Sequence, residues 1–271
     1  MTRLFGCTCN QPQHLQTALE PVRSALLIEA PVIRWGVGYV QGGEVLLSRH
    51  PRLSEEPVDI FESLGSLRSD YLIGHSSSDD GLRGNPNTQP FRFRQWMFAQ
   101  QGHIEPFDEL RQQLLEHTPA YLRRNIKGKT SGEYVFHLFL SFLHDAGTLD
   151  DPNVDPMEVR RVLRDTLALV FGAITKLGGN DQARRPGNAV VSNGRSMLAL
   201  RLDTPMYMRR LKVADSAGKG QNQSGESFRG VLALSSDKPI EELGEGFEEI
   251  PKRSVLVISR DLRTDIVSLD A

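Results

Sequence analysis

The order of strand-like and helix-like segments is the feature that most constrains this chain. Residues 130–145 and 156–177 carry apolar side chains at the spacing of long amphipathic helices. Segments with strand character, several of them joined by tight turns, precede these helices and follow them. The chain does not alternate single strands with single helices, as a doubly wound parallel sheet would require. The order therefore predicts an α+β fold in which two stacked, mostly antiparallel sheets are covered by helices.

Shorter segments complete this prediction. Asp155 and Pro156 form a helix-start signal, and Gly178 with Gly179 forms a stop signal. The remaining helical segments are 15–27, interrupted by Pro21, 56–64 and 107–117. The predicted strands are 34–40, 45–48, 70–75, 94–99, 189–192, 197–202, 229–235 and 254–259. A polar stretch rich in Gly, Ser and Gln at 213–226 predicts a loop.

Charge and hydropathy limit the partners of the chain. The 271 residues include 32 Lys and Arg against 34 Asp and Glu, which gives a formal net charge of −2. A charge of that size produces no global field that would recruit nucleic acid or an anionic membrane. No apolar run approaches the roughly 18–20 residues that span a bilayer, and the start is too short and too polar for a signal peptide. We therefore expect one cytoplasmic domain over residues 1–271 that binds neither nucleic acid nor membrane.

The cysteine and histidine positions favour neither a disulfide nor a metal site. Cys7 and Cys9 are the only cysteines in the sequence. A C-x-C pair on a strand splays its two thiols, so we expect both to be buried and reduced. His137 and His144 lie two helical turns apart rather than the one turn that suits a shared metal. The sequence therefore predicts no metal and no cofactor.

The second residue is a candidate nucleophile. Removal of the initiator Met1 would leave Thr2 with its hydroxyl beside a free α-amine. In such a pair the amine accepts a proton while the hydroxyl attacks a carbonyl, and an amine pKa of about 7.7–8.0 leaves part of it neutral at physiological pH. The alternative is that Thr2 is a strand residue with a satisfied hydroxyl. Cys7 is disfavoured as a substitute because it lies inside the strand and lacks the amine.

Four stretches of the chain match, in order, the motifs of one family. They are Met1-Thr2-Arg3-Leu4-Phe5-Gly6, Trp35-Gly36-Val37-Gly38-Tyr39, Ile73-Gly74-His75 with Asn87-Thr88-Gln89-Pro90-Phe91, and Trp96-Met97-Phe98-Ala99-Gln100-Gln101-Gly102-His103-Ile104. Together they resemble the class II glutamine amidotransferases, a family of N-terminal-nucleophile hydrolases, and within it the single-domain members such as the ergothioneine-pathway amidohydrolase. The resemblance spans nearly the whole chain. It implies a four-layer α/β/β/α sandwich, with residues 1–271 as a single glutamine amidotransferase type 2-like domain.

The resemblance also implies roles for individual residues. Thr2 stands where the family has a nucleophilic cysteine. Gln101 replaces the asparagine whose amide helps to form the oxyanion hole, and Gly102 keeps the backbone N–H of that hole. Ser77 replaces the arginine that holds the substrate carboxylate, and His75 keeps a family position that we expect to be structural. The predicted catalytic residues are therefore Thr2, Gln101 and Gly102, and the predicted substrate-binding residues are Arg3, Trp35, Gly36, His75 and Ser77.

These departures leave two hypotheses open. In the first, Thr2 attacks a γ-glutamyl-like or other small amide rather than free glutamine, because a serine hydroxyl cannot replace a bidentate arginine clamp. Arg83, Arg92 and Arg94 are either stand-ins for that clamp or surface charges. In the second, the protein is a catalytically silent family member that binds or regulates a protein partner or another copy of itself. Retention of Met1 would favour the second hypothesis, since the amine would then belong to the wrong residue.

Overall fold

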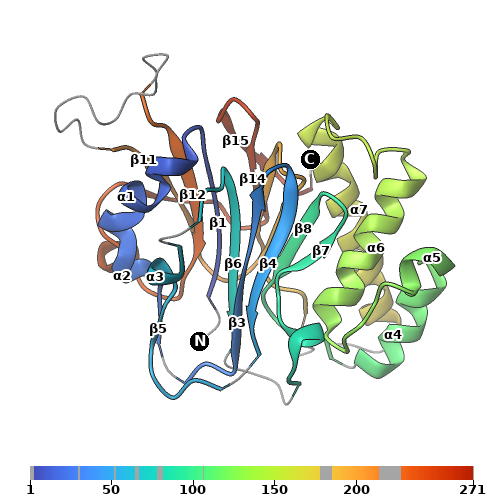
Figure 1. Ribbon diagram of the computed structural model, residues 1–271. Helices are drawn as coiled ribbons and strands as arrows, with labels where there is room; N and C mark the ends of the chain where they lie inside the picture. The colour runs from blue at the N-terminus through green and yellow to red at the C-terminus, as the bar shows by residue number, and fades with distance from the viewer. Residues whose placement is uncertain are drawn as a thin grey trace.

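Two large antiparallel sheets face each other between layers of helices. The computed structural model describes residues 3–29, 31–51, 53–64, 67–77, 82–105, 107–177, 185–213 and 227–270. Figure 1 shows the two sheets side by side in the middle of the molecule, with α1–α3 outside one of them and α4–α7 outside the other. This arrangement confirms the predicted α+β sandwich with its four α/β/β/α layers.

The first sheet is built around the strand that begins the described chain. Its strands, in spatial order, are β13 (Phe247–Glu249), β11 (Met206–Leu211), β12 (Gly230–Ser235), β1 (Leu4–Cys9), β6 (Tyr71–Ser77), β3 (Arg34–Gln41) and β4 (Glu44–His50). All six residues of β1 are buried, because β12 and β6 flank it and each sheet face is covered. Side chains alternate along it: Leu4 packs between the sheets, and Phe5 and Cys7 pack toward the helices.

The second sheet supplies the other inner face. Its strands, in spatial order, are β15 (Thr264–Ser268), β14 (Ser254–Ile258), β10 (Met197–Arg201), β9 (Ala189–Ser192), β8 (Trp96–Gln100) and β7 (Phe91–Phe93). Met97 and Ala99 join the cluster between the sheets, whereas Trp96 and Phe98 point to the helices. A separate pair, β2 (Leu27–Ile28) with β5 (Val58–Asp59), lies at the edge of the fold.

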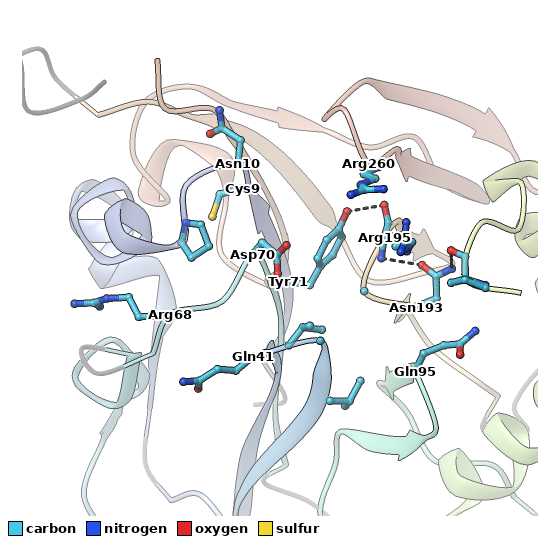
Figure 2. A pocket seen from close by; sticks show the side chains of 17 residues that line it. Cys9, Asn10, Gln41, Arg68, Asp70, Tyr71, Gln95, Asn193, Arg195 and Arg260 are labelled. Atoms are coloured by element: carbon cyan, nitrogen blue, oxygen red, sulfur yellow. Dashed lines mark hydrogen bonds between the residues drawn. The ribbon is translucent and has the colours of Figure 1, made fainter. Parts of the chain in front are cut away.

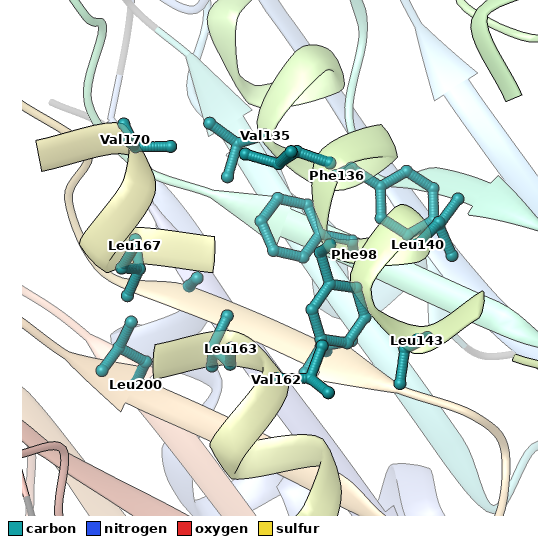
Figure 3. Packing of buried hydrophobic residues seen from close by; sticks show 14 of the residues in the cluster. Phe98, Val135, Phe136, Leu140, Leu143, Val162, Leu163, Leu167, Val170 and Leu200 are labelled. Carbon is teal, nitrogen blue, oxygen red and sulfur yellow. The ribbon is translucent and has the colours of Figure 1, made fainter. Parts of the chain in front are cut away.

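Helices cover the outer face of each sheet. They are α1 (Leu15–Leu19), α2 (Arg23–Leu26), α3 (Ile60–Leu64), α4 (Phe107–Glu116), α5 (Ala120–Arg123), α6 (Ser131–Asp145) and α7 (Pro156–Lys176), with short 3₁₀ turns at Pro12–His14, Glu20–Val22, Asn85–Asn87 and Ile240–Glu242. Figure 3 shows how side chains of α6 and α7 meet those of the second sheet. Phe98 on β8 stacks on Phe136 of α6, with ring centroids 5.4 Å apart. This apolar layer holds the helices on the sheet, since apolar burial is the main favourable term in folding.

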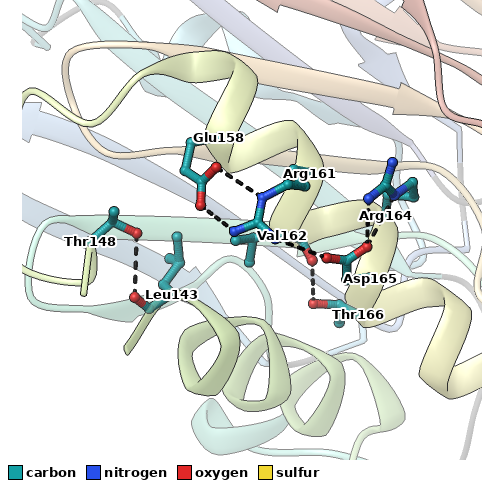
Figure 4. A network of polar contacts seen from close by, with 8 residues as sticks. All are labelled: Leu143, Thr148, Glu158, Arg161, Val162, Arg164, Asp165 and Thr166. Carbon is teal, nitrogen blue, oxygen red and sulfur yellow. Dashed lines mark hydrogen bonds and ion pairs between the residues drawn. The ribbon is translucent and has the colours of Figure 1, made fainter. Parts of the chain in front are cut away.

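The solvent side of α7 carries a chain of ion pairs. Arg161 pairs with Glu158, one turn earlier, and with Asp165, one turn later, and Arg164 also contacts Asp165 (Figure 4). These side chains are partly exposed, so solvent screening keeps the contribution of each pair to helix stability small. The network is a surface feature far from the inner faces of the sheets.

The structure also corrects parts of the element prediction. The helical segment 15–27 is interrupted at Pro21 as predicted, since Pro21 falls in the 3₁₀ turn between α1 and α2, but Leu27 belongs to strand β2 rather than to the helix. The strand predicted to begin at Arg94 begins at Trp96 instead, since Arg94 has a φ of 52° and forms a turn with Gln95. Strands β2, β5, β7, β11, β13 and β15 were not predicted. The stop signal at 178–179 and the loop at 214–226 lie outside the described residues.

Candidate active site at one end of the two sheets

Polar side chains gather between the sheets at one end of β1. Leu4 pairs with His75 on β6 and with Ser235 on β12, so these two residues lie on either side of the strand start. From the facing sheet, β8 ends at Gln100 and continues into Gln101. The predicted nucleophile Thr2 lies outside the described residues and stays a prediction. The described residues that surround the beginning of β1 therefore define the geometry of this end.

Gln101 is held in place by hydrogen bonds from both sheets. The Ser235 hydroxyl donates to Gln101 Oε1 at 2.7 Å and accepts from Asn188 Nδ2 at 3.0 Å. The Gln101 backbone N–H donates to the Asn188 carbonyl at 2.8 Å, and its own carbonyl accepts from the Gly187 N–H at 2.9 Å. Gln101, Ser235 and Asn188 are all buried. Oε1 accepts from Ser235, and the amide nitrogen carries the N–H groups that an oxyanion hole requires.

Gly102 occupies a position that only glycine fits. Its φ is +85°, a region that side chains with a Cβ rarely adopt. A Cβ built there would lie 2.9 Å from both the Arg185 carbonyl oxygen and the Gly187 backbone nitrogen. Among the described residues, none accepts a hydrogen bond from the Gly102 N–H. This exposed N–H, directly after the anchored Gln101, can therefore donate to a bound ligand.

His75 is buried and uncharged between the sheets. Burial lowers its pKa to about 3, and the nearby positive charge of Arg34 contributes to this effect. Its Nε2 lies 3.4 Å from the side-chain nitrogen of Gln89. That same Gln89 amide pairs with the backbone of Gln100, accepting from its N–H at 2.7 Å and donating to its carbonyl at 2.9 Å. An imidazole with this pKa is uncharged at neutral pH and keeps a single ring N–H, so it packs as a neutral group beside the end of β8.

The buried side chain of Arg34 lies opposite Ser77, a pairing that was not predicted from the sequence. In the register of β3 and β6, Arg34 is directly across from Ser77, and such pairs share one face of a sheet. Arg34 is 3% exposed, and its Nη1 donates to the Leu82 carbonyl at 2.6 Å. Ser77 lies two residues after the inward-facing His75, so strand alternation places both Ser77 and Arg34 on the inner side of the sheet. The strand neighbouring Ser77 therefore supplies a positive charge where the resemblance expects one at position 77.

Arg3 points away from this group. Its backbone N–H donates to Ser76 Oγ at 3.0 Å, and its guanidinium donates to Ser236 Oγ at 2.7 Å and to the Leu27 carbonyl at 3.4 Å. Burial lowers the pKa of Arg3. Ser76 and Ser236 each follow an inward-facing residue, so these contacts lie on the helix side of the sheet. Arg3 therefore fixes the start of β1 from behind the inner face.

Trp35 and Gly36 occupy opposite faces of β3. Trp35 packs in the apolar cluster with α1–α3 and stacks on His50, with ring centroids 3.9 Å apart. Gly36 faces the other sheet, where a Cβ would lie 2.5 Å from the Gln89 carbonyl oxygen. The structure thus brings His75, Ser77, Gln101 and Gly102 to one end of the inner space, with Gly36 lining it and with Trp35 and the Arg3 side chain outside it.

The cysteines do not contribute to this end of the fold. Cys7 and Cys9 are free and buried, as predicted from their place on a strand. Burial raises the pKa of Cys7 and raises that of Cys9 to about 12. Both thiols are therefore protonated and unreactive at neutral pH. In the described ranges, no group of three or more His, Cys, Asp or Glu side chains could hold a metal ion.

Comparison with solved structures assigns the fold. The chain has a TM-score of 0.62 and 17% identity to a glutamine aminotransferase class-II domain protein from Silicibacter pomeroyi, covering 98% of this chain and 99% of that one. It has a TM-score of 0.53 and 16% identity to a predicted glutamine amidotransferase from Pseudomonas aeruginosa, with coverage of 98% and 99%. The chain thus has the fold seen in these class II glutamine amidotransferase domain structures.

A longer enzyme shares the same fold over part of its length. Glutamine phosphoribosylpyrophosphate amidotransferase from B. subtilis matches with a TM-score of 0.59 and 13% identity, covering 98% of this chain and 49% of that one. This chain therefore corresponds to about half of that enzyme. No family model matches the sequence, and no curated protein matches it by sequence. In the part of the chain that the structure describes, no helix is long and apolar enough to cross a membrane.

Proposed function

We propose that the protein is an amide hydrolase of the class II glutamine amidotransferase type, acting on a small γ-glutamyl-like amide. The observation that carries this proposal is the pair Gln101–Gly102. One residue has its carboxamide oriented by Ser235 and Asn188, and the next presents an exposed backbone N–H. Preorganised donors of this kind stabilise the negative oxygen of a tetrahedral intermediate, and removing one typically costs about 2.7–4 kcal/mol of activation free energy.

The proposed reaction begins with removal of Met1. The Thr2 hydroxyl attacks the amide carbonyl carbon, and the Thr2 α-amine accepts the hydroxyl proton. The carbonyl electrons move to the oxygen, which accepts hydrogen bonds from the Gly102 N–H and the Gln101 amide. As the intermediate collapses, the C–N bond breaks and the leaving amine takes the proton from the α-amine. Water then hydrolyses the Thr2 ester by the same sequence and frees the enzyme.

The substrate class follows from the charges at this end of the inner space. Ser77 carries a hydroxyl, and Arg34 across from it carries a buried positive charge. The Arg34 guanidinium already donates to the Leu82 carbonyl, and both residues have further interactions within the protein. This pair therefore differs from a two-pronged arginine clamp for a carboxylate. For this reason we propose an acidic amide other than free glutamine as the substrate.

The first test is the intact mass of the untagged protein, followed by treatment with a glutamine-like electrophile. The proposal expects a mass short by one methionine, a single covalent adduct on Thr2, and ammonia or amine release from a panel of γ-glutamyl amides. Thr2→Ala should abolish the adduct, whereas Thr175→Ala on the exposed face of α7 should leave it unchanged. A protein that retains Met1 would refute the Thr2 mechanism and support a catalytically silent protein, and an adduct that persists in Thr2→Ala would refute it by showing that another side chain reacts.

A further inference from the structure

A cavity lies at the end of the sheets away from the candidate active site. It measures about 660 Å³, which is within the range of small-molecule sites. It is bordered by the far end of β1 at Cys9, the start of β6 at Tyr71, and the turn between β9 and β10. The six residues of β1 separate the two ends, a distance of about 20 Å at the rise of a strand. The cavity is therefore distinct from the group around Gln101.

Arginines surround this cavity. Its lining includes three arginines, Arg68, Arg195 and Arg260. Asp70 is the single carboxylate among the lining residues. Three positive charges against one negative charge leave an excess of two positive charges. Figure 2 shows Arg68 on one side and Arg195 and Arg260 on the other, with Asp70 and Tyr71 between them. Burial raises the pKa of Tyr71 to about 12, so its phenol adds no negative charge at neutral pH.

In the described part of the chain, none of these arginines has a carboxylate within ion-pair distance. Arg68 donates to the carbonyl of Leu67 at 3.3 Å, and Arg195 donates to the neutral Asn153 side chain at 3.1 Å. Other arginines of the protein do have acidic partners, as in the pairs Arg23–Asp59, Arg94–Asp150, Arg201–Glu249 and Arg253–Asp270. The arginines that face this cavity thus keep donors for a further anion.

The backbone that carries Arg195 is fixed in place. Asn193, which is 4% exposed, accepts hydrogen bonds on its side-chain oxygen from the backbone N–H groups of Arg195 at 3.0 Å and Ser196 at 2.9 Å. The Tyr71 hydroxyl donates to the Arg195 carbonyl at 2.6 Å. Gly194, with a φ of +75°, permits the tight turn between them. Only the arginine side chain remains to be ordered on binding, which lowers the entropic cost of holding a ligand.

We propose that this cavity binds a small organic anion carrying more than one phosphate or carboxylate group. One anionic group would lie between Arg195 and Arg260, where planar guanidinium groups can donate paired hydrogen bonds. Arg68 on the opposite side would reach a second group. The amide side chains of Gln41 and Gln95, which also line the cavity, would contact the polar remainder of the ligand. This site is independent of the proposed amide hydrolysis.

Calorimetric titration at constant ionic strength tests the proposal with two probes, inorganic pyrophosphate and citrate. We expect saturable binding of at least one probe, and the preferred probe tells whether the site favours phosphate or carboxylate groups. Arg195→Gln and Arg260→Gln should each weaken that binding about tenfold, as expected for the loss of a charged hydrogen-bond donor. Asp70→Asn should tighten it, because the repelling carboxylate is removed.

Matched variants separate this effect from general charge and from folding. Arg161→Gln removes the same charge from the exposed face of α7 and should leave binding unchanged. Tighter binding by Asp70→Asn cannot arise from a misfolded protein, so it supports the proposal even if one arginine variant is unstable. Failure of both probes to bind at millimolar concentration, or equal weakening by Arg161→Gln, would overturn the proposal.

Discussion

Three glycine-to-alanine substitutions can separate backbone strain from steric conflict at the candidate oxyanion hole. Gly102 has a φ of +85° and Gly147, at the end of α6, has a φ of +72°. A Cβ at Gly102 would meet two backbone atoms at 2.9 Å, whereas a Cβ at Gly147 would meet nothing within 4 Å. Gly172, inside α7, also has open space, and its φ is not positive. The three positions therefore differ in strain and crowding in a controlled way.

The expected magnitudes follow from these differences. Gly147→Ala should cost about 1–2 kcal/mol of unfolding free energy, the price of a left-handed L residue. Gly102→Ala should cost that amount plus about 1–3 kcal/mol, because neither backbone contact can move as a flexible side chain would. Gly172→Ala should stabilise the protein by about 0.5–1 kcal/mol, since alanine is the better helix former. We expect the order of stability to be Gly172→Ala, wild type, Gly147→Ala, Gly102→Ala.

Thermal and urea unfolding measure this order. A change of 1 kcal/mol corresponds to roughly 2–4 °C in Tm for a chain of this size. If the proposed function holds, Gly102→Ala should also lose amide hydrolysis beyond its loss of stability, whereas Gly147→Ala should retain activity below its Tm. Equal destabilisation by Gly102→Ala and Gly147→Ala would refute the steric argument and mean that the backbone of 185–187 yields to a methyl group.

Further predictions concern buried polar groups near the strand ends. The pKa of His75 is about 3 in the folded state and about 6.5 when unfolded, so between these pH values the unfolded state binds more protons. The free energy of unfolding should therefore rise with pH in this window. Chemical denaturation at a series of pH values should show a smaller rise for His75→Asn. Cys7 and Cys9 should resist a thiol reagent in the folded protein, since both are buried with raised pKa values, and should react together after unfolding; rapid labelling of the native protein would contradict the burial. Ser235→Ala should cost about 1–3 kcal/mol in urea unfolding, because Gln101 Oε1 loses its donor in a buried site, and an unchanged midpoint would show that this bond is dispensable.

Local patterns in the sequence were sufficient for most of the fold. The apolar spacing of α6 and α7 predicted both helices to within a residue or two, because that face packs on one continuous sheet. Strand β11 was missed since Arg209 and Arg210 interrupt its apolar run, and its stability comes from pairing with β12 and β13. Strand β15 was missed for a related reason: it is a largely exposed edge strand, defined by β14 rather than by burial.

The candidate site shows the limit of sequence reasoning more sharply. Gln101 and Gly102 were found from a motif, but the groups that orient Gln101 lie 87 residues further along the chain at Asn188 and 134 residues away at Ser235. No local sequence pattern predicts contacts between residues so far apart in the chain. No role was predicted for Arg34, because its position across from Ser77 is a matter of strand register. The missing information is thus pairing between distant segments rather than residue type.

The position of β1 at the centre of the first sheet has a consequence for how the protein is made. One partner of β1, β6, ends at residue 77, but the other, β12, begins at residue 230. On a ribosome, which releases the chain from its beginning, the first strand must wait for most of the protein before its second neighbour emerges. Until then it presents an apolar, unpaired edge, the kind that invites association with other chains. Synthesis of β12 gives β1 its second neighbour and places Ser235 at the candidate site, so slow synthesis of the second half should expose nascent chains to aggregation and to chaperones.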